Sequence, residues 1–179
     1  MSKSVLISIR PEWCKLIARG FKTVEVRKSR PKLETPFNVY IYCTKGKEKL
    51  LDVMFDGDEC YGETYHGDPV FIKGFPERFY NENYECGNGK IIGEFVVNYI
   101  DEITPNESYD EKAIESEPYC FHTLQTLASS CLSKKKIQKY LKDKPGYGWY
   151  ISDLVIYDTP RELSEFGKAK PPQSWCYID

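Results

Sequence analysis

Apolar and polar residues alternate in several separate segments of the chain, as they do in strands that bury one face. The segment at 89–103 is the longest, and it is apolar enough to lie in the middle of a sheet. A short final segment at 174–178 suits an edge strand. These patterns predict about six strands, at residues 4–10, 23–28, 38–44, 89–103, 148–158 and 174–178.

A helix is predicted between the first two strands. Pro11 stands where the first helical turn would begin, and its fixed backbone angle suits that position. Trp13, Leu16 and Ile17 follow at helical spacing, and Gly20 is a stop signal. The chain therefore passes from the first strand to the second through one short helix.

A second helical segment is predicted at 108–144, before the last long strand. Its final part places four apolar side chains in one stripe beneath a face covered by lysines, and Pro145 with Gly146 ends it. The stripe consists of Leu132, Ile137, Tyr140 and Leu141. Lysines 134 to 136 and 139 fit either a solvated helix face or an extended phosphate-binding face.

Residues 45–88 interrupt this order with many glycines, acids and tyrosines, and only 70–75 has the pattern of a short strand. We expect one domain over residues 1–179 with a loop-rich acidic insertion at about 45–88. The order of the elements favours an α+β fold built on a small mixed β-barrel rather than a doubly wound sheet, because only one helix-sized crossover is present and it is short.

Charge is distributed unevenly along the chain although the net charge is only -2. Residues 1–50 carry 12 Lys or Arg against 4 Asp or Glu, whereas residues 51–120 carry 4 against 17. Residues 121–179 carry 9 against 6. Such blocks either neutralise one another in the fold or leave one face positive and suited to phosphate.

The chain has seven cysteines without a C-x-x-C spacing, and it has no signal peptide and no long apolar stretch. These features indicate a cytoplasmic protein with reduced, mostly buried thiols and no membrane span. His66 and His122 are far apart, and neither Cys60 nor Cys120 beside them completes a metal-ligand set. No phosphate-binding glycine loop is present. We therefore expect no metal and no cofactor.

The segment 20–28 holds the candidate site. Thr23, Glu25 and Arg27 share one parity of the second strand, and Lys22 precedes them at the strand entry. Lys22 would reach the same side if the chain bends after Gly20, as glycine allows. The three charged residues then either form an ion pair on an exposed edge strand or line a pocket that binds an anion.

The pattern S-I-x-P-x-W-x-x-x-I-x-x-G-x-K-x-x-E-x-R over 8–27 resembles the signature of the ASCH domain superfamily, of the bacterial and phage-associated type. The segments 89–95 and 171–175 resemble further parts of such members. The resemblance implies a barrel related to the PUA fold, with a cleft near the first helix and the second strand and an RNA, nucleotide or nucleoside ligand. The residues it implies for ligand binding are Ser8, Arg10, Trp13, Lys22, Glu25 and Arg27.

Trp13 has two interpretations. At the rim of the cleft it would stack on a base, as aromatic residues do in single-strand binders. On an amphipathic helix it would instead pack into the core.

The resemblance also leaves a choice between a binding module and an enzyme. Some members are amidohydrolases acting on N4-acetylcytidine with a lysine, a threonine and a glutamate, and others resemble ribonucleases. Lys22 matches the lysine, but Glu25 stands where the threonine is expected, and Thr23 is a weak substitute. The second acid would be one of Glu107, Glu111 and Glu115. We expect an RNA- or nucleotide-binding domain, with a small hydrolase using Lys22 and Glu25 as the alternative.

Overall fold

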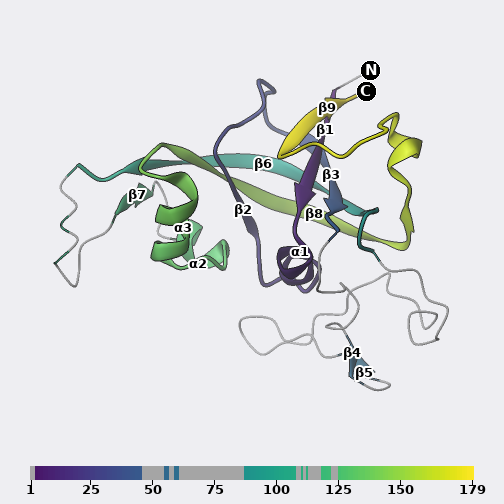
Figure 1. Cartoon of the computed structure of the whole chain (residues 1–179), viewed down its shortest axis with the longest axis horizontal. Helices are drawn as coiled ribbons and strands as arrows, with labels where there is room; N and C mark the ends of the chain where they lie inside the picture. The colour runs from purple at the N-terminus through teal and green to yellow at the C-terminus, as the bar shows by residue number, and fades with distance from the viewer. Residues whose placement is uncertain are drawn as a thin grey trace.

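A computed structural model of the chain describes residues 3–45, 55–56, 59–60, 87–107, 110, 112, 118–121 and 125–179. Seven strands form one mixed sheet in the order β2-β8-β6-β3-β1-β9, with β7 paired to the far end of β6 (Figure 1). The strands are β1 (Ser4–Ile9), β2 (Val24–Arg27), β3 (Phe37–Cys43), β6 (Ile91–Pro105), β7 (Tyr119–Phe121), β8 (Gly146–Arg161) and β9 (Trp175–Ile178). A separate two-stranded ladder joins β4 (Phe55–Asp56) to β5 (Glu59–Cys60).

The helices are α1 (Pro11–Ala18), α2 (Gln125–Ser129) and α3 (Lys134–Leu141), and a 3-10 turn spans Leu163–Phe166. Helix α1 connects β1 to β2, as the sequence predicts, whereas α2 and α3 lie together beside β2 (Figure 1). Strands β1 and β3 run parallel, and every other pairing of the main sheet is antiparallel. The prediction of a mixed α+β fold is confirmed.

Strand β1 is buried on both faces, which explains its nearly continuous apolar sequence. Val5, Ile7 and Ile9 enter the main core with the inner face of α1, and Leu6 enters a second core on the other face of the sheet. A third apolar cluster, which includes Val26 of β2, packs α3 against the sheet. The molecule therefore has α1 on one side of β2 and the α2–α3 pair on the other.

The predicted barrel is wrong in one respect, because the sheet is open. In the part of the chain that the structure describes, the edge strands β2 and β9 share no ladder. Strand β9 pairs with β1 only from Ser4 to Ile7, so the end of β1 extends beyond it. Both edge strands have only four residues. The gap between the end of β1 and β2 is called the seam below.

The predicted helical segment at 108–144 is also corrected. Its described part contains the strand β7 and two short helices. Ile137 and Leu141 are buried as predicted, but Tyr140 is 37% exposed. The acidic insertion predicted at about 45–88 lies almost wholly outside the described residues, as do His66 and His122.

Of the five cysteines whose side chains the structure describes, Cys14 and Cys43 are buried and Cys120 is exposed. Among the same described residues, no three His, Cys, Asp or Glu side chains gather as a metal-binding group would require. None of the described helices combines the length and the apolar character needed to cross a membrane.

Candidate functional site at the seam

The path of the chain after α1 brings Lys22 to the seam. Gly20 follows the helix with a φ of 75°, a left-handed conformation that glycine adopts without strain. The backbone N–H of Lys22 donates to the carbonyl oxygen of Leu16 at 3.0 Å, and that of Thr23 donates to Ser129 of α2 at 2.9 Å. These bonds hold the segment between α1 and α2 and turn the Lys22 side chain inward.

The ammonium group of Lys22 is saturated with protein acceptors. It donates to the carbonyl oxygens of Val24 at 2.8 Å and Ser130 at 2.7 Å, and it forms an ion pair with Glu25 at 3.2 Å. Lys22 is only 2% exposed. An ammonium group has three protons, so these three acceptors occupy all of them.

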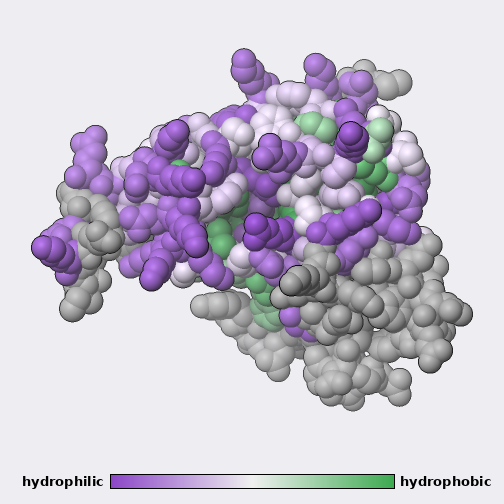
Figure 2. All heavy atoms as spheres, viewed as in Figure 1, coloured by the Kyte–Doolittle hydropathy of each residue, from purple (hydrophilic) through white to green (hydrophobic). Residues whose placement is uncertain are grey.

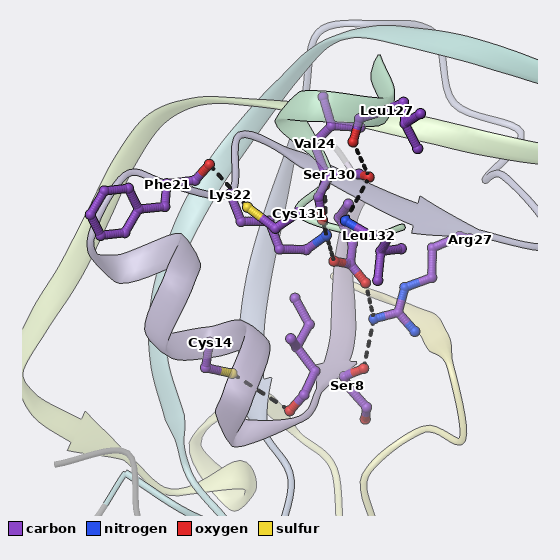
Figure 3. A network of polar contacts seen from close by, with 12 residues as sticks. Ser8, Cys14, Phe21, Lys22, Val24, Arg27, Leu127, Ser130, Cys131 and Leu132 are labelled. Atoms are coloured by element: carbon purple, nitrogen blue, oxygen red, sulfur yellow. Dashed lines mark hydrogen bonds and ion pairs between the residues drawn. The ribbon is translucent and has the colours of Figure 1, made fainter. Parts of the chain in front are cut away.

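Glu25 lies between two cations. One carboxylate oxygen faces Lys22, and the other lies 2.9 Å from Nη2 of Arg27. Arg27 also donates from Nη2 to the carbonyl oxygen of Ser8 at 2.7 Å (Figure 3). Its Nη1 lies 3.5 Å from Oγ of Ser174. The guanidinium group of β2 thus spans the seam to the end of β1.

The cluster of Lys22, Glu25 and Arg27 is almost completely buried and carries a surplus positive charge. Glu25 and Arg27 are 6% and 7% exposed, and one carboxylate faces two cations. Nε of Arg27 is buried and has no hydrogen-bond partner among the described residues. Because an uncompensated buried charge is costly, the arrangement favours an anion or a polar acceptor beside Arg27.

A hollow of about 640 Å³ opens over this cluster, and we call it the seam pocket. That volume lies in the range of small-molecule sites. Five basic and two acidic side chains line it, a difference of +3, although the whole chain has a net charge of -2. Its lining comprises Ser8, Ile9, Arg10, Glu12, Trp13, Lys22, Glu25, Val26, Arg27, Thr44, Leu132, Lys136, Lys139, Tyr140, Gln173 and Ser174.

Trp13 forms one wall of the seam pocket and packs against the main core with part of its ring. The ammonium nitrogens of Lys22 and Lys136 lie 5.5 and 5.2 Å from its ring centroid. Both distances are within the range of a cation–π contact. Trp13 therefore both packs against the core and lies at the rim of the pocket. Its ring contacts two lysines there.

Tyr140 stands at the mouth of the seam pocket on α3. Nζ of Lys28 lies 5.0 Å from its ring centroid. Burial raises the pKa of its hydroxyl group, whereas the charge of Arg27 acts in the opposite direction and that of Glu25 adds to the increase. The tyrosine therefore remains a neutral hydroxyl donor beside the ion cluster at neutral pH.

Helix α2 is anchored by a polar contact that also fixes the Lys22 environment. The hydroxyl group of Thr126 donates to the Asp101 carboxylate and lies 2.8 Å from the hydroxyl group of Tyr150. Thr126 and Asp101 are buried. This contact attaches α2 to β6 and β8, and the chain directly after α2 presents the Ser130 carbonyl oxygen to Lys22.

The structure brings together most of the residues that the sequence analysis names. The seam pocket is lined by Ser8, Arg10, Trp13, Lys22, Glu25 and Arg27. Thr23 is exposed and does not line it, and neither does Glu107. Glu111 and Glu115 lie outside the described residues.

Sequence reasoning missed several contributors to the pocket. Gln173 and Ser174 line it and belong to the segment 171–175, to which the sequence assigns no function. The hydroxyl group of Ser8 donates to the Pro172 carbonyl oxygen at 2.6 Å, which fixes this segment beside the seam. The 164 residues between those partners leave no local pattern that would predict the contact.

The open mixed sheet and its seam pocket define an α+β protein in which the first strand, the first helix and the second strand converge on one polar site. The model of the ASCH domain family matches residues 7–159, so the chain belongs to this family. No curated protein matches the chain in sequence.

The fold is similar to that of crystal structures of ASCH from Zymomonas mobilis. One has 16% sequence identity and a TM-score of 0.57, and the match covers 98% of this chain and 87% of that one. A tyrosine-to-phenylalanine mutant of that protein has 16% sequence identity and a TM-score of 0.56, and the match covers 99% of this chain and 91% of that one. For a serine-to-alanine mutant the identity is 16%, the TM-score is 0.55, and the match covers 98% of this chain and 88% of that one. At this identity the similarity concerns the fold.

Proposed function

We propose that the seam pocket binds RNA or a nucleotide, with a phosphate or a base edge at Arg27. The observation that carries the proposal is the buried cluster of Lys22, Glu25 and Arg27, which has a surplus positive charge and lines a hollow of about 640 Å³. The family to which the chain belongs is generally linked to RNA binding, which supports the same ligand class.

Within this site the groups divide into a fixed floor and an accessible rim. Lys22 is engaged with Glu25 and two protein carbonyls, and Glu25 is engaged with Lys22 and Arg27, so their contribution is to hold Arg27 and to set the local charge. Lys136, Lys139 and Tyr140 on α3 are exposed and line the pocket, so a ligand can reach them. Phosphate contacts then come from the lysines, and ring stacking comes from Tyr140.

A hydrolase that uses Lys22 as a base or nucleophile fits this geometry less well. Lys22 would have to release one of the three protons that its acceptors hold, so one of these buried acceptors would lose its donor. The catalytic roles expected for Lys22 and Glu25 therefore stay a prediction, and binding is the function that the site supports best.

Calorimetry with nucleosides, nucleoside 5′-monophosphates and random-sequence single-stranded RNA hexamers tests the proposal. We expect the monophosphates and the hexamers to bind more tightly than the nucleosides, and both affinities to fall as salt rises from about 50 to 200 mM. The double variant Lys136→Gln/Lys139→Gln should weaken binding about tenfold. The matched control Lys3→Gln/Lys170→Gln, which changes two exposed lysines outside the pocket, should leave it unchanged.

No binding of any of these ligands would overturn the proposal. Affinity that ignores salt, or that responds equally to both double variants, would also count against the seam pocket as the site.

A further inference from the structure

Helix α3 and the residues just after it carry more lysine than folding requires. Residues 134–144 contain six lysines and one acid, Asp143. The first turn of α3 is all lysine and holds no acid, although the positive end of the helix dipole favours acids there. Charges of both signs usually alternate on a helix that only faces solvent. The lysine content therefore indicates an anionic partner.

The orientation of α3 divides these lysines between the seam pocket and the surface beside it. Ile137 and Leu141 face the core. At about 100° per residue, Lys136 and Tyr140 turn away from that core side toward the pocket that they line. Figure 2 shows hydrophilic residues crowded on this face of the molecule over α3.

Two exposed lysines of α3 and the exposed lysine directly after the helix make up what we call the α3 lysine stripe: Lys135, Lys139 and Lys142. Lys135 and Lys139 recur at i and i+4, so they lie on one side of the helix, and Lys142 follows as the C-cap residue in a left-handed conformation. Lys139 also lines the seam pocket. The stripe therefore meets the pocket at its middle residue and runs beside it over about 10 Å, at 1.5 Å per residue.

Tyr140 stands where the pocket opens toward this surface. Its ring is 37% exposed and has Nζ of Lys28 at 5.0 Å from the centroid. Aromatic rings set among basic side chains are what single-strand nucleic-acid binders use, because a base stacks on the ring while its phosphates pair with the cations. An acidic peptide would match the lysines but has no flat base to place on the ring.

We propose that a single-stranded RNA leaves the seam pocket over Tyr140 and continues along the α3 lysine stripe. The ligand is then an oligonucleotide rather than a lone nucleotide. The three lysines of the stripe can each pair with one phosphate of the strand. This inference rests on the proposed function of the pocket, and it adds the direction and the length of the ligand.

Fluorescence anisotropy with labelled random-sequence RNA of two, four, six and eight nucleotides tests the length dependence. We expect affinity to increase at least tenfold from two to eight nucleotides. The variant Lys135→Gln/Lys142→Gln, which changes only stripe residues outside the pocket, should abolish this gain while nucleoside monophosphates bind as before. Losing two phosphate contacts should also reduce the salt slope for the octamer by about 1.4.

The variant Lys3→Gln/Lys170→Gln is the matched control and should keep both the length gain and the salt slope. Monophosphate binding with no gain from longer RNA would overturn the stripe but leave the pocket proposal intact. An oligoglutamate of the same charge as the octamer that binds equally tightly would identify a general polyanion surface and overturn the RNA assignment. Absence of any nucleotide binding would overturn both proposals.

Discussion

Arg27 joins the two sides of the open sheet, because its Nη2 atom lies 2.7 Å from the carbonyl oxygen of Ser8. The pairing of β9 with β1 stops at Ile7. The next N–H group of β1, that of Ser8, donates to the carbonyl oxygen of Ser174 at 2.9 Å. A guanidinium group therefore occupies the place where a closed barrel would have a backbone donor. The same side chain forms the floor of the seam pocket, so sheet closure and the candidate site share one residue.

Removal of the Arg27 charge should destabilise the fold. Arg27→Met leaves the Ser8 carbonyl oxygen without this donor and Glu25 with only one cation, and breaking a buried pair typically costs about 3 kcal/mol or more. Urea unfolding measures the change. The control is Arg10→Met at the exposed rim, where the side chain is 76% exposed and the change should stay within about 0.5 kcal/mol. Equal stability of the two variants would contradict a structural role of Arg27 at the seam.

The buried pair of Lys22 and Glu25 should show strong coupling in a double-mutant cycle. Lys22→Met and Glu25→Gln each leave a buried charge less compensated, so each should cost about 3–5 kcal/mol, and the double variant should cost clearly less than the sum.

The exposed pair of Arg161 and Glu165 is the reference, with Nε 3.0 Å from Oε2 but side chains 45% and 43% exposed. Solvent screening should keep its coupling energy far below that of the buried pair. Additive effects at Lys22 and Glu25 in urea unfolding would show that the two charges do not depend on each other.

The sequence predicts the elements around the site because their patterns are local. Alternation identifies β1 and β2, and proline and glycine delimit α1 to within two residues. Parity predicts that Glu25 and Arg27 share a face, and their contact at 2.9 Å confirms it. The glycine bend after α1 also explains how Lys22, of the other parity, joins them.

The remaining features depend on contacts that local periodicity does not encode. Closure by Arg27 requires the pairing of β9 with β1 to stop at Ile7, and the paired residues lie 168 to 174 positions apart in the chain, from Ile7 with Trp175 to Ser4 with Ile178. The spacing of Tyr140 fits the apolar stripe of α3, but the helix buries only Ile137 and Leu141. Tyr140 is not part of the third apolar cluster, and its ring lies at the mouth of the pocket. The short strand β7 has too few residues for alternation to be recognised.

Stability should fall at high pH partly through Tyr157. Burial raises the pKa of its hydroxyl group above the usual value of about 10, and so does the hydrogen bond of 2.9 Å that it donates to Glu94. The folded protein then keeps this proton where the unfolded chain loses it. The contribution is therefore fully present below about pH 10 and is lost as the pH rises above that value.

The variant Tyr157→Phe separates this effect from other alkaline titrations. It should be less stable than the wild type by about 0.5–1.5 kcal/mol at pH 8, because the hydrogen bond to Glu94 is lost. Its free energy of unfolding should then fall less steeply above about pH 10. Urea unfolding followed at several pH values provides both numbers, and parallel curves for the two proteins would exclude Tyr157 as a source of the pH dependence.

Turnover distinguishes a binding site from a hydrolase at the same residues. Lys22 donates all three ammonium protons to Val24, Ser130 and Glu25, so it has neither a lone pair for attack nor a proton free for a leaving group. We therefore expect no product from N4-acetylcytidine or from single-stranded RNA, measured by liquid chromatography after long incubation. Hydrolysis by the wild type that Lys22→Met abolishes and Lys170→Gln preserves would contradict this expectation and assign Lys22 a catalytic role. Because Lys22→Met also weakens the ion cluster, its folding must be verified by circular dichroism before a loss of turnover is assigned to chemistry.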